Sequence, residues 1–523
     1  MKSIRRKIMN LNNFFTGTGS LILLLMITTP VLSNSLEIHG FVSQGYLQTD
    51  RDNYMVKTEE GSFKFNEIGF NVSNDISDDL RLGIQFLSRS LGDQCENATT
   101  IDWAFADYRY HDLLGFRFGR IKIPLGLYNE IRDIDMLRTS IFLPSSIYSE
   151  PWRDTMSSLD GIGLYGYLSL NGMGGVSYQA LVGQMETPED GGVARYIERI
   201  GTNDVIHMEP SKSYNASLLW DLPIEGLSLG SSYLSNKMKV TSLFGDHFTF
   251  GDLRLLTDMN AQLPEMLNEV IYNKTQNQNM ASMMSSDFIN WLIPQNYQNL
   301  DNEWPKEVIS DFHTLDFWVL SLKYQWGDFI LSAEQLDMRM DFDYKLGDIN
   351  LRASPQPWHS LGYYVSGSYT FKDWLEFGVY YSEFYDTDND KHAESYVKKR
   401  ELDTYKYPTA VLYAVSSEEI RQNFKTYANK VFAASGKTIK LSDDDVAAIK
   451  LISDYELNRI KYNEYVGWFK ELVVSTSAHI NEQWTLKLEG HFIDGISLMD
   501  WTVNNGDIPR KRFLFASKVT FSF

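Results

Sequence analysis

Residues 511–523, KRFLFASKVTFSF, end the chain with large apolar side chains spaced two residues apart. Successive side chains of a β-strand point to opposite faces, so this spacing predicts a strand with one apolar face and one small or polar face. In a soluble protein such a strand packs one face against a core, whereas in a membrane barrel its apolar face contacts lipid. The rest of the chain must decide between these two alternatives. The apolar positions are Phe513, Phe515, Val519, Phe521 and Phe523.

The start of the chain indicates export. Lys2, Arg5, Arg6 and Lys7 precede the apolar stretch SLILLLMITTPVL, which is too short to span a bilayer comfortably. We expect residues 1–35 to be a cleaved signal peptide, with cleavage after Ser33 fitting nearly as well. An uncleaved anchor helix is the alternative, and its short length counts against it.

The two-residue alternation recurs along the remaining chain. In LRLGIQFLSR, residues 80–89, apolar side chains alternate with Arg81, Gln85 and Arg89. No later segment reaches the 18 or more apolar residues of a membrane helix, so any membrane span must consist of strands. Sixteen strands are predicted, at 36–49, 61–74, 79–90, 99–110, 114–123, 159–170, 175–184, 213–220, 227–238, 313–326, 328–341, 358–371, 374–386, 467–480, 484–495 and 513–523.

The connections between these strands alternate in length. NDISD, HDLL, NGMG, PIEG, GD, KD and NEQ are tight, whereas the intervening connections are long. A soluble sandwich has no reason to gather its long loops at one end, but transmembrane barrels have short periplasmic turns and longer external loops. The predicted fold is therefore all-β: a transmembrane antiparallel up-and-down β-barrel of about sixteen strands, covering residues 36–523, whose last strand pairs with the first.

Aromatic residues at strand ends would then form the girdle at the membrane interface. The candidates are Trp103, Trp326, Trp374, Trp484 and Phe523.

Composition narrows the partners. The net charge of −20 becomes −24 once the four cations of the leader are removed, which argues against a nucleic-acid partner. Cys95 is the one cysteine, so no internal disulfide is expected, and its role stays open. We find no cofactor motif and no metal-ligand cluster.

Two connections, 239–312 and 387–466, are far longer than the others. SSEEIRQNFKTYANKVFAA begins with a capping box, Ser416 with Glu419, so both connections are expected to be partly helical external loops.

The stretch after the fifth strand, FRFGRIKIPLGLYNEIRDIDMLRTSIFLPSSIYSEPWRD (residues 116–154), resembles the third loop of the Gram-negative outer-membrane porins, especially the substrate-selective group. The opening LEIHGFVSQGYLQTD and the terminal Phe add to the resemblance. It implies that residues 124–158 fold into the barrel as a constriction loop, and that the chain forms a homotrimer. It also implies that the alternating residues of the last strand, ending at Phe523, are an assembly signal for the outer-membrane insertion machinery.

A barrel of this size leaves an aqueous channel, whose narrowest ring of side chains filters solutes. Cations outnumber anions among the candidates, so we expect a porin that passes small hydrophilic solutes by diffusion, with anions favoured. Mutual pairing of the two Arg-Asp dipeptides, 132–133 and 153–154, is the alternative, with those residues only holding the loop. The candidate constriction residues are Arg81, Arg89, Arg120, Lys122, Arg132, Asp133, Asp135, Arg138, Arg153 and Asp154.

The sequence also bears on two other functions. No G-x-S-x-G motif is present, and His39, His359 and His491 have no nucleophile at a fixed spacing, so no enzyme is expected. A surface receptor or adhesin, binding a partner through its long loops, remains the main alternative to a porin.

Overall fold

The structure is a computed structural model. It describes residues 36–92, 96–189, 191–194, 203–244, 307–346, 349–352, 358–388, 391, 429, 464–498 and 509–523. The predicted signal peptide, Cys95, the predicted helices and most of the two longest connections lie outside the described residues.

One antiparallel sheet closes on itself, as β1 pairs with both β2 and β18. The sheet contains eighteen strands at sixteen positions, since β8 and β9 follow one another along β10, and β13 and β14 along β12. The predicted sixteen-stranded barrel is confirmed. The strands are β1 (Leu36–Thr49), β2 (Phe65–Ser77), β3 (Leu80–Leu91), β4 (Glu96–His111), β5 (Leu114–Lys122), β6 (Ser158–Ser169), β7 (Gly175–Met185), β8 (Asn203–Pro210), β9 (Lys212–Asp221), β10 (Leu227–Phe244), β11 (Glu307–Trp326), β12 (Phe329–Leu346), β13 (Ile349–Arg352), β14 (Trp358–Phe371), β15 (Leu375–Tyr385), β16 (Trp468–His479), β17 (Trp484–Gly495) and β18 (Lys511–Ser522).

Helical structure is sparse in the described chain. The short helices are η1 (Asn129–Ile131), η2 (Asp135–Leu137), α3 (Arg153–Met156), η3 (Asn171–Met173) and η6 (Glu464–Gly467). Among the described residues no helix is long and apolar enough to cross a membrane.

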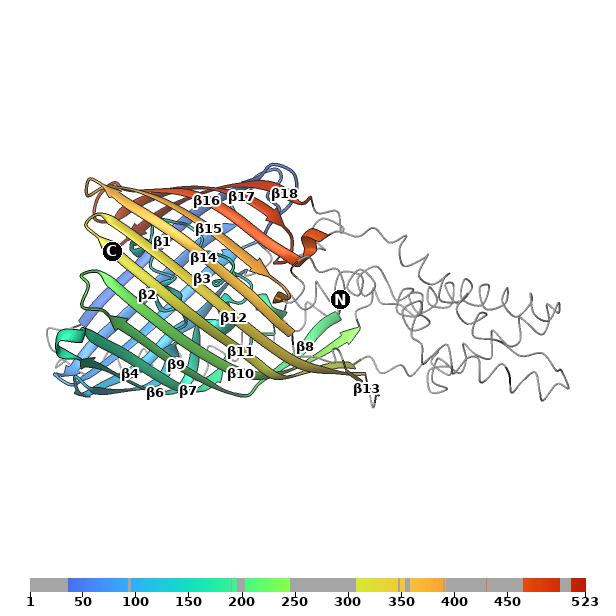
Figure 1. The fold of residues 1–523 in the computed structure, drawn as a ribbon, viewed down its shortest axis with the longest axis horizontal. Coiled ribbons are helices and arrows are strands. Elements are labelled where there is room, and N and C mark those ends of the chain that lie inside the picture. The colour runs from blue at the N-terminus through green and yellow to red at the C-terminus, as the bar shows by residue number, and fades with distance from the viewer. Residues whose placement is uncertain are drawn as a thin grey trace, which may run out of the picture.

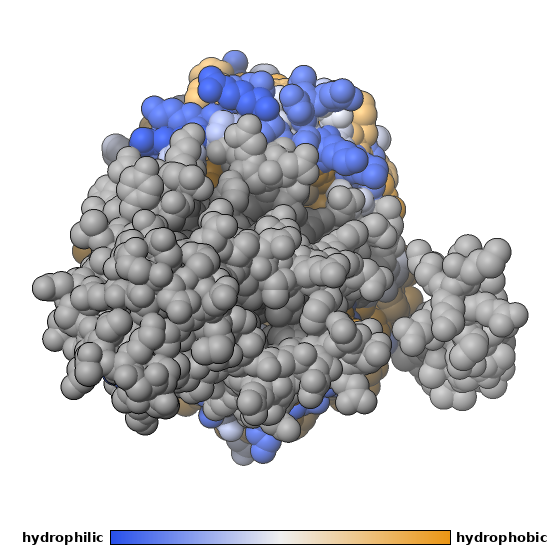
Figure 2. Space-filling model, turned by 90° about the vertical axis from the view of Figure 1, so that its right-hand side faces the viewer, coloured by the Kyte–Doolittle hydropathy of each residue, from blue (hydrophilic) through white to orange (hydrophobic). Residues whose placement is uncertain are grey.

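The strands run obliquely around the barrel, with the tight turns and the C-terminus at one end and the longer connections at the other (Figure 1). At the ends β10, β11 and β12 extend beyond the predicted limits, by as much as six residues. Seen from the end with the longer connections, the hydrophilic described residues gather at the top and bottom of the view and hydrophobic ones show along the flanks (Figure 2).

The outward faces are apolar, as the alternation predicted. On β18, Phe515 and Val519 are more than a third exposed, whereas Leu514 and Ala516 on the opposite face are fully buried. Phe523 closes the barrel at the turn end, because its backbone N–H and carbonyl both bond to Gly40 at 2.9 Å. The outward position of the four predicted aromatics at this end is also observed, with Trp326, Trp374, Trp484 and Phe523 between 41% and 70% exposed.

Trp103 does not belong to this outer girdle, and that prediction is wrong. It lies directly opposite Gln85, whose amide bonds Asp133 inside the barrel, and directly opposite residues share a face. Its ring packs over Gly83 and against Phe105. An extra residue in β4 at this point shifts the alternation, which the sequence pattern did not reveal.

Candidate functional site inside the barrel

The connection between β5 and β6, residues 123–157, is here called the interior segment. Its base is closed by the backbone N–H of Ile123, which donates to Ser157 at 3.0 Å. Farther along, Leu127 N–H donates to Glu334 on β12, and Arg153 pairs with Glu67 on β2 at 2.7 Å. Because β2 and β12 lie on opposite sides of the ring of strands, the segment crosses the interior of the barrel.

Local contacts fold the segment into its compact path. The buried Asn129 amide donates to the carbonyls of Ile123 and Met156, both at 2.9 Å, and so ties η1 to the base. Irregular backbone buried inside a protein needs partners for its carbonyl groups. Lys487 on β17 supplies them, since its Nζ donates to the carbonyls of Asp135, Arg138 and Ser140 at 2.6, 2.7 and 3.2 Å.

Three carboxylates on the barrel wall accept backbone N–H groups of the segment. Glu489 accepts from Ile141 and Phe142, and Glu471 accepts from Ser145 at 2.9 Å. On the other side, Glu334 accepts from Leu127 at 2.8 Å and from the hydroxyls of Tyr148 and Tyr364. Hydrogen bonds to charged groups contribute about 1.5–3 kcal/mol each, so these carboxylates hold the segment firmly at both sides.

Glu150 is the centre of one group of ion pairs. Its carboxylate lies 3.0 Å from both Arg89 and Arg132 and 3.8 Å from Arg153. Burial alone would raise the pKa of Glu150, but these three guanidinium groups outweigh burial and lower it to about 2. Arg89 also contacts Asp154 at 3.4 Å. The group thus joins β3 to Arg132 in the first half of the segment and to Glu150 and Asp154 near its end.

Asp135 is the centre of a second group. It pairs with Lys518 on β18 at 2.8 Å and with Arg138 at 3.3 Å, and it accepts the Thr520 hydroxyl at 2.7 Å. Burial opposes ionisation here too, yet Lys518, Lys487 and Arg138 hold the pKa of Asp135 well below its usual range. Lys518 also pairs with Glu67, which links this group to Arg153.

Lys122 forms a third group at the entrance of the segment. Its Nζ lies 2.6 Å from Asp102 and 3.0 Å from Asp133. The Gln85 amide donates to the same two carboxylates. The pKa of Asp133, which burial would raise, is lowered chiefly by Lys122.

The structure brings eight of the ten predicted residues together in these three groups. The Arg-Asp dipeptides do not pair internally: Arg132 bonds Glu150, Asp133 bonds Lys122, Arg153 bonds Glu67, and Asp154 bonds Arg89. The eight residues are Arg89, Lys122, Arg132, Asp133, Asp135, Arg138, Arg153 and Asp154.

The other two predicted residues lie elsewhere. Arg81 is half exposed toward the turn end, where it pairs with Glu37 at 2.7 Å. Arg120 pairs with Asp160 and Glu186, and it shares its face of β5 with the exposed Phe118. Arg117 on the opposite face contacts Gln179, which bonds Glu130 of the segment, so Arg120 lies on the outer face of the barrel.

The sequence interpretation did not select the partners on the barrel wall. Lys487, Glu489 and His491 fall within the predicted strand 484–495 and were not among the candidate constriction residues. A signal was present, because three ionisable side chains in a row on the inward face of one strand are unusual when buried. The missed residues are Glu150 on the segment itself and, on the wall, Glu67, Glu334, Glu471, Lys487, Glu489, His491 and Lys518.

Apolar packing fills the space on both sides of the segment. Phe142 packs with Phe65, Phe469 and Leu514 on one side of the barrel. Its neighbour Leu143 packs with residues of the opposite wall, including Leu234 and Leu336. Consecutive residues of the segment therefore belong to two separate apolar clusters.

Close approach of the segment to the wall also needs glycine. A Cβ on Gly362 of β14 would lie 2.3 Å from the carbonyl oxygen of Ser146, far inside van der Waals contact. The missing side chain lets the Ser146 hydroxyl reach the Tyr363 carbonyl at 3.2 Å. Within the described chain no group of three or more potential ligands is arranged to hold a metal ion.

Comparisons with known proteins give matches among solved structures and none among families or curated sequences. No family model matches the chain, and no curated protein matches it. The solved structures that resemble it include outer-membrane proteins. OmpT of Vibrio cholerae has 8% identity and a TM-score of 0.45, covering 94% of this chain and 99% of that one.

Two further structures are similar to a comparable degree. The anion-selective porin of Comamonas acidovorans has 9% identity and a TM-score of 0.43, over 94% of this chain and 99% of its own. OmpF of Salmonella typhi, in complex with daunomycin, has 10% identity and a TM-score of 0.44, over 93% and 97%. At such low similarity no function is carried over from these proteins.

Proposed function

We propose that the protein is an outer-membrane channel of the porin type, through which small hydrophilic solutes diffuse past the interior segment. The observation that carries this proposal is a closed barrel with exposed apolar residues on its outer face and a charged segment across its interior. Val365 and Leu320 are 62% and 51% exposed on the outer face, where lipid would cover them.

The charge inside the barrel bears on which solutes pass. The three groups of ion pairs around the interior segment join seven cations to six carboxylates, so this set is close to neutral. Glu334, Glu471 and Glu489 are further interior carboxylates, and His491 lies 3.3 Å from Glu471 and 2.6 Å from Glu489. The cations on which the expected anion preference rested are therefore compensated, and we expect the channel to discriminate weakly between anions and cations. The seven cations are Arg89, Lys122, Arg132, Arg138, Arg153, Lys487 and Lys518.

The remaining expectations belong to the same proposal. Export through a cleaved signal peptide would deliver the chain to the outer membrane of a Gram-negative bacterium. The outward residues of β18 and Phe523 would be recognised by the insertion machinery, and the apolar outer face would contact lipid or the neighbouring subunits of a homotrimer.

Planar-bilayer recording tests the proposal. Purified protein spanning residues 36–523 should give discrete current steps, and a salt gradient should give a reversal potential close to zero. A strongly anion-selective reversal potential would contradict the neutral interior but leave the channel intact. Absence of steps from correctly folded protein would reject the channel itself.

The packed interior favours one alternative, a closed barrel that acts as a surface receptor or adhesin. Apolar clusters on both sides of the interior segment reduce the space open to solutes. Deletion of the chain between β10 and β11 separates the two functions. A channel should keep its conductance after the deletion, whereas a receptor should lose binding of its partner.

A further inference from the structure

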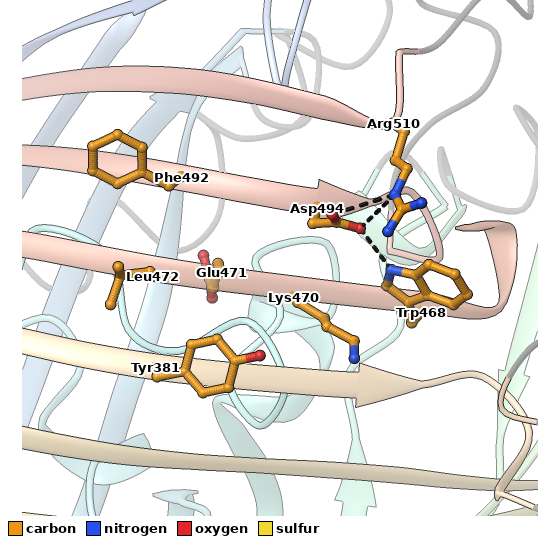
Figure 3. Close-up of a pocket in the computed structure, with 8 residues that line it drawn as sticks. All are labelled: Tyr381, Trp468, Lys470, Glu471, Leu472, Phe492, Asp494 and Arg510. Atoms are coloured by element: carbon orange, nitrogen blue, oxygen red, sulfur yellow. Dashed lines mark hydrogen bonds and ion pairs between the residues drawn. The ribbon is translucent and has the colours of Figure 1, made fainter.

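A pocket of about 260 Å³ lies on the barrel surface near the end that carries the longer connections (Figure 3). It is formed by β15, β16, β17 and Arg510, the residue before β18. Inward-facing His491 and Ile493 are 2% and 3% exposed, so their neighbour Phe492, 55% exposed, faces outward. Glu471 contributes to the pocket from β16, but its carboxylate belongs to the interior network. The lining residues are Tyr381, Trp468, Lys470, Glu471, Leu472, Phe492, Asp494 and Arg510.

The part of the pocket nearer the longer connections is charged and aromatic. Asp494 accepts hydrogen bonds from Arg510 Nε at 3.0 Å and from Trp468 Nε1 at 2.9 Å (Figure 3). The Arg510 guanidinium lies 5.3 Å from the centre of the Trp468 ring. The Lys470 ammonium lies 5.7 Å from the same ring, so the indole holds two cations beside the pocket.

Positive charge exceeds negative charge around this part. Lys470, Arg510 and Lys511 face two carboxylates, Asp494 and Glu383. Glu383 already accepts the hydroxyls of Tyr363, Tyr381 and Tyr385, and Lys470 is 3.6 Å from it. Among the described residues, three cations thus stand beside two carboxylates on the outer side of the pocket, while the third carboxylate, Glu471, points into the barrel.

The part of the pocket nearer the tight turns is apolar. Leu472 and Phe492 are 41% and 55% exposed on the outer face. Along the same two strands, toward the turn end, Val474 and Leu488 are exposed as well. The pocket therefore stands where an apolar surface meets a cationic one.

We propose that this pocket binds a phosphorylated lipid of the outer leaflet. The anionic headgroup contacts Lys470 and Arg510, and an acyl chain lies along Leu472 and Phe492. The two cations can bind a phosphate at the membrane interface. The outer surface next to them, toward the tight turns, offers apolar contacts for an acyl chain. The inference rests on the proposed outer-membrane location.

Native mass spectrometry of the detergent-solubilised protein with dioleoyl phosphatidic acid tests the proposal. We expect one tightly retained lipid per barrel, and at least a tenfold weaker retention in the double variant Lys470→Gln/Arg510→Gln. The matched control is Lys239→Gln/Arg339→Gln, which removes two exposed outer-face cations elsewhere, each paired with a carboxylate. This control should retain the lipid as the wild type does.

Several outcomes would overturn the proposal. Equal retention by both double variants would show that these cations do not bind the headgroup. Equal retention of dioleoyl phosphatidylcholine would mean that phosphate charge is not recognised. Competition by inorganic phosphate alone at equal concentration would indicate a site for a free anion instead of a lipid. Bilayer conductance, recorded on the same preparations, reports separately whether the channel proposal fails.

Discussion

Single charged residues hold the interior of this barrel. Glu150 is almost fully buried, and it is tolerated there because three guanidinium groups surround it. Breaking such a buried arrangement leaves uncompensated charge, which costs about 3–5 kcal/mol. Sequence reasoning selected most of the cations, since they lie in one conspicuous stretch. It could not select Glu67 or Lys518, because Glu67 pairs with Arg153, 86 residues away, and with Lys518, 451 residues away.

Glu150→Gln should lower the free energy of unfolding at pH 7 by about 3–5 kcal/mol, because Arg89, Arg132 and Arg153 lose their shared counter-charge. The folded-state pKa of about 2 lies below the usual 4.5, so the stabilisation is complete above pH 4.5 and is lost as the pH falls toward 2. The gap between wild type and variant should therefore shrink over that range. Urea unfolding at a series of pH values measures it.

Glu186→Gln is the matched control, since Glu186 pairs with Arg120 on the outer face and is half exposed. It should change stability by no more than about 1 kcal/mol at any pH. A pH-independent difference between Glu150→Gln and wild type would contradict the assigned ionisation.

At the scale of elements, the strands were predictable and the interior segment was not. The two-residue alternation of each strand is a local sequence signal, so all sixteen positions were predicted, with errors of a few residues at most strand ends. The path of the segment depends instead on Glu334, Glu489 and Gly362, which no local pattern links to it. The resemblance to a porin loop suggested its inward course, but not its partners.

Removing either apolar contact of the segment should loosen it. Phe142→Ala and Leu143→Ala should each destabilise the barrel by about 2–5 kcal/mol and raise single-channel conductance and current noise, because each opens space on one side of the interior. Planar-bilayer recording provides the measurement. Phe118→Ala, on the lipid-facing surface, is the control and should leave conductance unchanged. Wild-type currents from all three variants would show that the segment does not limit passage.

At the scale of the whole molecule, the apolar outer face defines how the barrel sits in a membrane. Aromatic residues mark the turn end, and Val365 on β14 lies in the middle of the apolar face above them. Alternation predicted this surface well, because every second side chain of a strand faces lipid and must be apolar. The bulge that turns Trp103 inward is the kind of irregularity that such a rule misses.

Val365→Arg should destabilise the barrel in lipid vesicles by about 2–4 kcal/mol, because it places a charge near the membrane midplane. In Trp484→Arg, at the turn end, the charge should lower the free energy of unfolding by only about 0–1 kcal/mol, because it lies near the membrane interface. Urea titration of folding into vesicles compares the two. Equal costs would mean that β14 and β17 do not cross the membrane at the proposed depth.

Several interior contacts join residues that are far apart in the sequence, which has a consequence for the folding of the newly made chain. The hydroxyl of Thr520 bonds Asp135, 385 residues earlier, and Lys518 bonds Glu67, 451 residues earlier. Such contacts carry a high contact order, and they form only after the final strand has arrived. Until then Asp135 and Glu67 lack Lys518, one of the cations that offset their desolvation. A chain that loses its last strand therefore forfeits both the seam of the barrel and the cation that joins Glu67 to Asp135, so we expect the interior segment of such a chain to dock less stably.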